Sequence, residues 1–571
     1  MARIMLVSFA GYPYTVSSLM PDNGLANLAG QLMQCGHAAR ILDYGTVETM
    51  DRLYPRDVHR LMVPLAESML TRKKTRLRDL ARVLWCGRRL KSHQQKVYTE
   101  LASEILGQAD EFDADAIGFK LWNGDGFEGT VRIAEIIRAR RPRLHLFAGG
   151  PHVDWFKSEI LRYTSAFEGL VMGEGEPVIG ALAEYVDGRR ALHEIPDMLY
   201  MEGGRIRRTN RADVADLNSM AMPCYSPDVY PSLLQSHQVR IPTIDESRGC
   251  PGRCAFCLHG RKSGTCWRLK SSQRLVGEIR SIQRDVPTHC FIYAGSNTPA
   301  ALAQNNARAI LEEGLDIRYA CFGHFKGMGK VDADLLARSG CGAIFFGLES
   351  ASRRLLTDTM HKDVPLGVAR DLLKRMRLSG ILSVASVIYP APFEDEQSRK
   401  ETLDFLMEVR PDSVPVQFPG LIPGTLWDRQ ASHFGFEFPK GRASARRKGL
   451  KYKIKLIYPP RLWAKLPYTL HGRSSKELIA QTGAFIQQLE QGGLTTGVGH
   501  DLALMAREIG MDIRTFRDRC RKAFLTGDVD DIRTLVDEIN VAAGQASKGD
   551  SAPKAAKPAG AFQAPMHHAP V

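Results

Sequence analysis

The stretch Glu246-Ser-Arg-Gly-Cys250-Pro-Gly-Arg-Cys254-Ala-Phe-Cys257 places three thiols in one short loop that Gly and Pro residues bound. Thiolates at this C-x3-C-x2-C spacing can hold three corners of a cubane iron–sulfur cluster and leave the fourth iron without a protein ligand. Such an open iron can coordinate a substrate, as the open position of a catalytic metal site does. We therefore expect Cys250, Cys254 and Cys257 to be metal ligands.

Zinc is an alternative for this loop, because His259 lies two residues beyond Cys257 and could complete a Cys3His site. A structural zinc site normally takes a pair of ligands from each of two segments, whereas these four candidates fall within ten residues. This crowding favours the cluster over zinc, and a chance grouping without metal is favoured least. Of the eleven cysteines, the other eight are scattered singly, as small buried hydrophobes often are.

Downstream of the loop, short apolar runs alternate with helical patterns. Together with a strand just before Cys250, they make about six β/α units, which predicts a partial or complete barrel over residues 241–439. The runs are 291–295, 317–322, 343–347, 383–389 and 414–419. In such a barrel the loops at the carboxyl ends of the strands carry the chemistry.

Upstream, a second α/β alternation predicts a doubly wound domain over residues 1–205, with a parallel sheet covered on both faces. Its strand candidates are 3–9, 38–42, 115–120, 144–150 and 167–173. A basic helical pattern at about 50–110 interrupts the alternation and is interpreted as an insertion. Residues 206–240 are predicted to form a connector to the barrel.

The C-terminal part has a different character. Residues 440–545 are basic and mostly helical in pattern, which predicts a small C-terminal domain, and 546–571 are rich in Ala and Pro, which predicts a disordered tail. The formal net charge of +14 is concentrated in part between residues 440 and 476. A solvated helical face is the favoured explanation of this basic stretch, although its interleaved aromatic residues also allow contact with a membrane surface or an anionic substrate.

The cysteine spacing, with the aromatic Phe256 before the third cysteine, resembles the signature of the radical S-adenosylmethionine (SAM) superfamily. This resemblance implies a [4Fe–4S] cluster whose open iron chelates SAM and donates the electron that cleaves it. It also implies that Gly295, Ser296 and Asn297, which follow a predicted strand, lie at the bound SAM. Glu349, in Gly347-Leu-Glu-Ser350, corresponds to the family's G-x-E-S element at the SAM ribose or amino group.

A Rossmann-like domain before such a barrel resembles the cobalamin-binding subclass of this superfamily. Its local marks are Gly149-Gly-Pro-His152 and Gly173-Glu-Gly-Glu176, each after a predicted strand. The resemblance implies that Gly149, Gly150, Gly173 and Gly175 let the backbone approach cobalamin closely. The alternative is that these glycines only make tight turns between strands and helices.

The loop after the first predicted strand departs from the subclass. Many of its cobalamin domains carry an Asp-x-His-x-x-Gly loop whose His ligates cobalt from below, whereas residues 10–24 contain no His. Asp57-Val-His59 imitates the motif but lacks its glycine and lies in the predicted insertion. We therefore expect a cobalt without a protein imidazole beneath it.

The resemblance implies a C-methyltransferase that transfers a SAM-derived methyl group through methylcobalamin to an unactivated carbon of a small-molecule, natural-product or peptide substrate. A flavodoxin- or ferredoxin-like protein would supply single electrons. The first alternative is a cobalamin-dependent radical SAM oxidative cyclase or ring-rearranging oxidoreductase. The second is a cobalamin- or nucleic-acid-binding regulatory protein, because residues 502–524 loosely resemble a helix-turn-helix; a nucleic-acid role is disfavoured.

The composition and the apolar runs of the sequence bear on the cellular compartment. Hydrophobic residues make up 44% and charged residues 25% of the 571 residues, as is ordinary for globular proteins. No apolar run reaches the roughly eighteen residues of a membrane span. Residues 1–14 could pass for a short signal peptide, but they lack a cleavage site and fit a buried first strand better. We therefore expect a cytoplasmic monomer.

Overall fold

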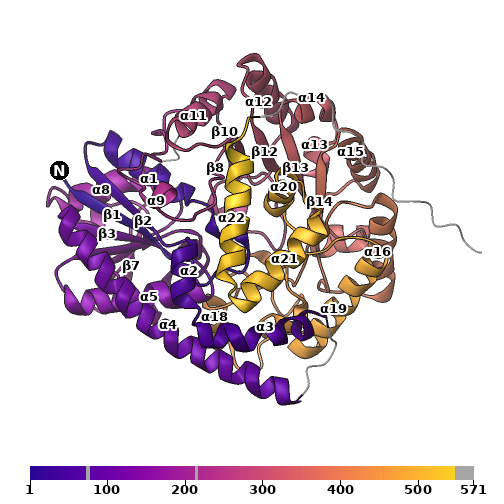
Figure 1. Cartoon of the computed structure of the whole chain (residues 1–571), viewed down its shortest axis with the longest axis horizontal. Helices are drawn as coiled ribbons and strands as arrows, with labels where there is room; N and C mark the ends of the chain where they lie inside the picture. Colours follow the sequence, from indigo (N-terminus) through magenta and orange to yellow (C-terminus); the bar gives the residue numbers. More distant parts are fainter. Residues whose placement is uncertain (72–76, 213–215, 454, 547–571) are drawn as a thin grey trace, which may run out of the picture.

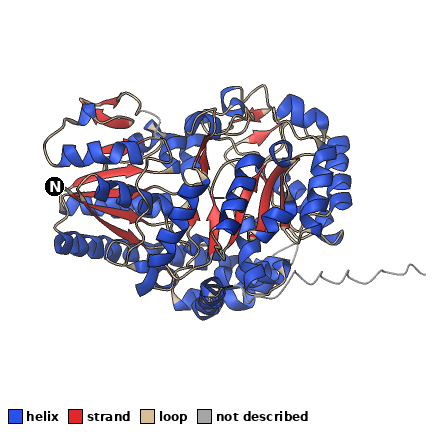
Figure 2. Ribbon diagram, turned by 90° about the horizontal axis from the view of Figure 1, so that it is seen from above, coloured by secondary structure: helices blue, strands red, loops and turns tan. Residues whose placement is uncertain are grey.

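The computed structural model describes residues 1–71, 77–212, 216–453 and 455–546, and the fold is α/β with two large, mainly parallel sheets (Figure 1, Figure 2). The predicted tail therefore lies outside the described residues, apart from its first position. The predicted boundaries of the other domains remain predictions. Among the described helices, none is long and apolar enough to cross a membrane.

The N-terminal sheet has seven strands in the order β2-β1-β3-β4-β5-β6-β7. The first five strands are parallel and fall on the five predicted apolar runs, and the last two form an antiparallel hairpin. The strands are β1 (Arg3–Ser8), β2 (Ala38–Asp43), β3 (Ala116–Lys120), β4 (His145–Gly149), β5 (Gly169–Val171), β6 (Met198–Glu202) and β7 (Arg205–Arg208). Because β1, β3, β4 and β5 run parallel, their carboxyl ends meet at one edge, where such sheets bind ligands.

Helices cover this sheet and extend well beyond it. The predicted insertion is three helices, of which α4 is by far the longest, and the last two pack against each other. The helices of this half are α1 (Asn23–Gln34), α2 (Val47–Leu53), α3 (Arg56–Thr71), α4 (Leu77–Phe112), α5 (Asp125–Arg140), α6 (Pro151–Phe156), α7 (Ser158–Tyr163), α8 (Glu176–Val186) and α9 (Ser232–Gln235).

The second sheet has six parallel strands in the order β15-β14-β13-β12-β11-β8, which agrees with the six predicted β/α units. The strands are β8 (Thr243–Ile244), β11 (Cys290–Tyr293), β12 (Arg318–Gly323), β13 (Cys341–Glu349), β14 (Leu382–Ile388) and β15 (Val416–Gln417). The connecting helices are α11 (Ser272–Asp285), α12 (Ala300–Glu312), α13 (Phe325–Met328), α14 (Ala333–Arg338), α15 (Leu366–Leu378), α16 (Glu396–Val409) and α17 (Leu426–Arg429). The sheet is a partial barrel, because β15 and β8 end it without pairing to each other.

The C-terminal helices follow the barrel in the chain, and the last three of them lie in the middle of the molecule in Figure 1. They are α18 (Arg442–Leu450), α19 (Ser475–Gln491), α20 (His500–Glu508), α21 (Ile513–Thr526) and α22 (Val529–Gly544). Helix α20 packs against β12, β13 and β14, and the ring of His500 contacts Phe322 and Phe345. A Cβ on Gly342 would lie only 2.7 Å from Leu504, so glycine at this position of β13 permits the close approach of the helix.

The place of α20 corrects the helix-turn-helix interpretation of residues 502–524. Its residues Leu502, Ala503, Leu504, Met505 and Ala506 are at most 3% exposed, because this helix packs into the core of the molecule. The following helix, α21, packs against α3 of the N-terminal half. The segment therefore joins the two halves of the molecule.

The basic stretch is also not a free solvated face. Arg442 and Arg446 form ion pairs with Asp428 at 2.7 and 3.7 Å, and Lys451 pairs with Glu128 of α5 at 2.7 Å. The ammonium groups of further lysines in this stretch lie over the ring of Tyr14. Much of this charge therefore stabilises contacts between the C-terminal segment and the rest of the chain.

Candidate functional site

The cysteine loop follows the short strand β9 (Ser247–Arg248), ends at helix α10 (His259–Lys262) and is closed by β10 (Arg268–Leu269), which pairs with β9. A Cβ on Gly252 would lie 3.3 Å from Sγ of Cys250 and 3.8 Å from Sγ of Cys254, so these two sulfurs border the same small space. The backbone N–H of His259 donates to Sγ of Cys257 at 3.4 Å. Hydrogen bonds of this kind suit thiolate ligands of a metal cluster.

The charges of the loop also fit a cluster. Burial raises the pKa of Cys254 to about 11, and it raises the pKa of Cys257 as well. The neighbouring thiols add to this effect, so three thiolates are costly here unless iron compensates their charge. Nδ1 of His259 lies 2.9 Å from Oγ of Ser296, and this contact joins the cysteine loop to the predicted SAM segment. In the described part of the chain, no group of three or more His, Cys, Asp or Glu side chains is gathered to hold a single metal ion.

The predicted SAM segment lies beside the cysteine loop. Glu246, the first residue of the decisive stretch, is fully buried, and its carboxylate accepts hydrogen bonds from N–H of Gly295 at 2.8 Å and from the hydroxyl of Thr298 at 2.5 Å. Asn297 lies against the cluster loop, with Nδ2 3.9 Å from Sγ of Cys250. Glu246 thus shapes the turn that brings the SAM segment to the first cysteine.

Glu349 ends β13 with a φ of +65°, a left-handed conformation that is strained for a residue other than glycine. Lys362 holds one of its carboxylate oxygens at 2.8 Å and the carbonyl oxygen of Gly347 at 2.7 Å. The other oxygen, Oε2, is buried without a hydrogen-bond partner among the described residues, as is Oδ1 of Asn297. Both orphaned atoms are acceptors, which fits a ligand that offers N–H or O–H donors, as SAM does.

Phe256 packs within the protein beside the cysteine loop. Its ring packs on Trp427, with 5.4 Å between the ring centroids, and the indole of Trp427 donates to the carbonyl of Thr359 at 2.9 Å. The aromatic position of the motif therefore anchors the cysteine loop to α17. Contact of Phe256 with a cofactor remains a prediction.

A cavity of about 430 Å³ lies between the carboxyl edge of the N-terminal sheet and the cysteine loop. The four glycines predicted to face cobalamin all line it: Gly149, Gly150, Gly173 and Gly175. Ser296, from the predicted SAM segment, and Arg248, from the strand before the cysteines, line it as well. The two sites predicted separately are thus neighbours.

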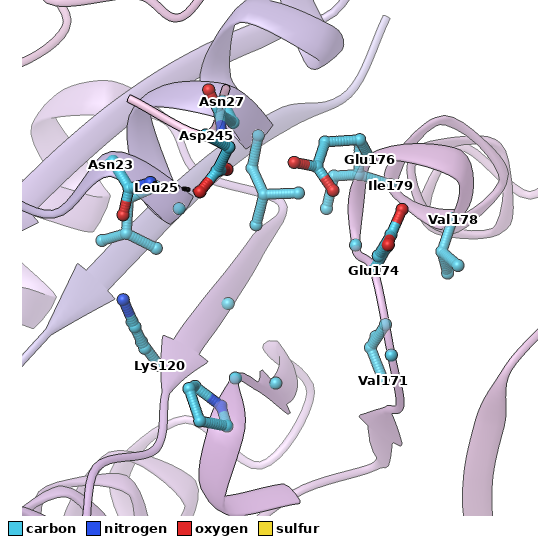
Figure 3. A pocket seen from close by; sticks show the side chains of 18 of the residues that line it. Asn23, Leu25, Asn27, Lys120, Val171, Glu174, Glu176, Val178, Ile179 and Asp245 are labelled. Carbon is cyan, nitrogen blue, oxygen red and sulfur yellow. Dashed lines mark hydrogen bonds between the residues drawn. The ribbon is translucent and has the colours of Figure 1, made fainter. Parts of the chain in front are cut away.

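The walls of the cavity fit a large, partly apolar ligand. Its apolar lining comes from strands β1 and β4 and from helices α1 and α8, including Leu6, Leu28 and Ile179. Its charged side chains lie on opposite sides: Figure 3 shows Lys120 on one side and Glu174 and Glu176 on the other. A Cβ on Gly173 would meet no atom within 4 Å, so the backbone of this glycine borders open space that a ligand can occupy.

No imidazole from the described part of the N-terminal half lines this cavity, and its one histidine, His259, comes from the barrel. Nδ1 of His59 lies 2.9 Å from the carbonyl of Thr526, which places this residue at α21. At the sheet edge stands Lys120, whose ammonium donates to Asp22 at 2.7 Å and lies over the ring of Trp122. The expectation of a cobalt without a protein imidazole beneath it remains a prediction.

Comparison with known proteins decides the family. Residues 246–406 match the model of the radical SAM superfamily, and residues 90–183 match the model of the B12 binding domain. The chain is a radical SAM protein with a B12-binding domain. These domains imply a [4Fe–4S] cluster, SAM and cobalamin as its cofactors.

The relatives of this radical SAM protein are distant. It is 25% identical to an uncharacterized methyltransferase of Pyrococcus horikoshii over 59% of the chain and 74% of that protein. It is 24% identical to the anaerobic magnesium-protoporphyrin IX monomethyl ester cyclase of Synechocystis sp. over 50% of the chain, which spans only 58% of that relative. The fold is similar to that of the radical SAM methyltransferase TsrM of Kitasatospora setae, whose structure was solved with cobalamin and a [4Fe–4S] cluster bound. The two structures superpose with a TM-score of 0.60 and 14% sequence identity, over 93% of this chain and 99% of TsrM. At this identity the likeness shows the fold.

Several charged residues of the site are not predicted from the sequence. Glu246 and Arg248 belong to the decisive stretch itself, and Glu174 and Glu176 each follow a glycine of the second cobalamin motif. Their charges, close to the predicted ligands, were the available signal. Lys362, which holds Glu349, follows it by thirteen residues without any local pattern that marks it.

Replacing Glu246 with glutamine is expected to flatten the pH dependence of stability. Burial raises the pKa of Glu246 from 4.5 to about 7, although Thr298 and Gly295 lower it. Between these values the folded chain keeps a proton that the unfolded chain has lost, so this group lowers stability as the pH rises from 4.5 to 7. Glutamine stays neutral, and the variant should gain on the order of 1–3 kcal/mol over the wild type above this range.

The measurement is the urea-unfolding free energy of both proteins at a series of pH values across this interval, at equal cluster content. The other titrating groups are common to the two proteins, so the difference curve isolates Glu246. Parallel curves would show that its carboxylate keeps its ordinary pKa.

Proposed function

We propose that this radical SAM protein is a C-methyltransferase that transfers a methyl group derived from SAM to an unactivated carbon of a small-molecule, natural-product or peptide substrate. The observation that carries the proposal is the shared cavity: Ser296, beside the cluster loop, and the four predicted cobalamin glycines line the same space. A methyl carrier bound next to the SAM-binding cluster is the proximity that methyl transfer needs. The methyltransferase names of the relatives support the proposal.

When bound, the cluster supplies an electron to SAM, and cobalamin carries the methyl group. Within the proposal, Cys250, Cys254 and Cys257 hold the cluster. Asn297 and Glu349 offer their orphaned oxygens to the donor groups of SAM, and Lys362 keeps the second oxygen of Glu349 in place. Each of these groups binds or orients, which is the protein's share in cofactor chemistry.

The surface at the cysteine loop is accessible to an electron-donor protein. Pro251, Gly252 and Arg253 are exposed, so a cluster held by this loop would lie near the protein surface. A flavodoxin- or ferredoxin-like protein is the proposed donor, because such proteins transfer single electrons to buried centres over short distances. The cytoplasm is the proposed compartment, since it keeps the three thiols reduced for cluster assembly. We propose a monomer as the active form.

The test is the analysis of products from the full-length protein after anaerobic reconstitution with iron, sulfide, cobalamin, SAM and a chemical reductant. A methyltransferase of this kind is expected to form S-adenosylhomocysteine in addition to 5′-deoxyadenosine. In parallel, extracts of a strain without the gene and of the complemented strain are compared by mass spectrometry. The expected result is a compound that is one CH2 unit heavier in the complemented strain.

An oxidative cyclase is the second candidate, favoured by the similarity to the Synechocystis cyclase. A cyclase would form 5′-deoxyadenosine without S-adenosylhomocysteine, and its product would lack the added carbon. This result would contradict the proposed methyl transfer while leaving the cofactors in place. Absence of iron–sulfur absorption from the reconstituted protein would contradict both candidates.

A further inference from the structure

An ion-pair network joins the β5–α8 loop of the B12-binding half to the strands on either side of the cysteine loop. Arg248 of β9 donates to Glu176 at 2.6 Å and 3.3 Å through its two terminal nitrogens. The same guanidinium lies 3.1 Å from Glu174 and 2.9 Å from Asp245. From β10, Arg268 donates to Glu174 at 3.1 Å. Three carboxylates and two guanidinium groups thus alternate in one cluster.

The network is largely withdrawn from solvent. The side chain of Arg248 is 14% exposed, and those of Glu174, Glu176 and Asp245 are 17%, 10% and 18% exposed. Asp245 also accepts hydrogen bonds from the amides of Asn23 and Asn27 on α1, at 3.4 and 3.3 Å. Ion pairs with this burial and with bidentate geometry hold a defined arrangement, unlike exposed pairs.

The place of the network links the two cofactor sites. Glu174, Glu176, Asp245 and Arg248 all line the cavity that contains the cobalamin glycines. Arg248 also stands two residues before Cys250, and the β9–β10 pair on which both arginines lie closes the cysteine loop. The glutamates therefore connect the loop of Gly173 and Gly175 to the backbone that carries the cluster ligands.

We infer that Glu174 and Glu176, through Arg248 and Arg268, form a positioning device that fixes bound cobalamin at one distance and orientation from the iron–sulfur cluster. The second cobalamin motif then has two parts: its glycines admit the cofactor, and its glutamates tie the cofactor loop to the cluster. The consequence for turnover rests on the proposed function, because methyl transfer needs both centres to face one substrate. A displacement of about 1 Å can cost about 100-fold in rate.

The test uses the double variant Glu174→Gln/Glu176→Gln, which removes both charges but keeps the shape of the side chains. The full-length protein is reconstituted with cluster and cobalamin and reduced until the cluster and cob(II)alamin are both paramagnetic. Pulsed EPR then measures the dipolar coupling between the two centres. We expect one narrow distance distribution in the wild type and a broadened or displaced one in the variant, at equal iron and cobalamin content.

The rate of S-adenosylhomocysteine formation should fall about 10- to 100-fold in the same variant, with little change in KM for SAM. Glu202→Gln is the matched control, because it removes an exposed ion pair with Arg207, 3.0 Å long, from the hairpin of the same sheet. This control should keep the wild-type distance distribution and rate. Arg248→Lys keeps the charge but loses the bidentate geometry, and it should give an intermediate distribution even if the double variant fails to fold.

An unchanged distance distribution in cofactor-loaded double variant or Arg248→Lys protein would overturn the inference. The inference would also be overturned if the variants failed to bind cobalamin instead of binding it at a changed distance, since the network would then be needed for binding and not for positioning. A wild type that shows the narrow distribution but forms no S-adenosylhomocysteine would contradict the proposed methyl transfer alone. The distance measurement decides the inference in that case as well.

Discussion

Replacing Cys257 with alanine is expected to remove the iron–sulfur cluster and, with it, all cleavage of SAM. The loop offers three thiols, and each is required to hold one corner of the cluster. Loss of an outer-shell partner typically costs about 10- to 100-fold in metal affinity or activity, so loss of a direct ligand should cost more. Formation of 5′-deoxyadenosine and S-adenosylhomocysteine should fall to background, together with the iron content and the visible absorption of the cluster.

Cobalamin binding should persist in Cys257→Ala, because Cys257 does not line the cavity that holds the four glycines. The matched control is Cys266→Ala. Cys266 is exposed and lies in the same connection between β9 and β10, but it is not one of the three spaced thiols. This variant should keep iron and activity at the wild-type level. Retention of SAM cleavage by Cys257→Ala, or zinc in place of iron in the wild type, would contradict the assignment of the cluster ligands.

The parts of the site that could be predicted from the sequence are those whose residues are close together in the chain. Three cysteines within eight residues show their spacing directly, and an apolar run shows a buried strand wherever it packs. The family resemblance added Asn297 and Glu349, because their motifs follow predicted strands in a fixed order. In both cases the signal is local.

The remaining features depend on partners far away in the sequence. The ion pairs of Arg248 with Glu174 and Glu176 bridge more than seventy residues, and the sequence alone does not show which charges will meet. An amphipathic pattern predicts the helix α20, but it does not predict that this helix will pack against the strands of the barrel. The sequence predicts a solvated face for the basic stretch for the same reason, since its acidic partners Glu128 and Asp428 belong to other elements.

Phenylalanine in place of Gly149 is expected to weaken cobalamin binding strongly while sparing the cluster. Gly149 ends β4 at the cavity, and a Cβ built on it meets no atom nearer than 3.7 Å, so the backbone tolerates a side chain. The benzyl group would then occupy space that the cofactor needs. Overpacking costs of about 1–3 kcal/mol correspond to a loss of roughly 10- to 100-fold in affinity.

Equilibrium dialysis with hydroxocobalamin measures this loss directly, and the iron content and SAM cleavage of the same preparation show whether the radical SAM half is intact. Gly149→Ala is the matched control: its single methyl group fits at the same position, so its affinity should stay close to that of the wild type. If the phenylalanine variant bound cobalamin as tightly as the alanine variant, the cofactor could not lie over the end of β4. The shared cavity would then no longer support methyl transfer between neighbouring centres.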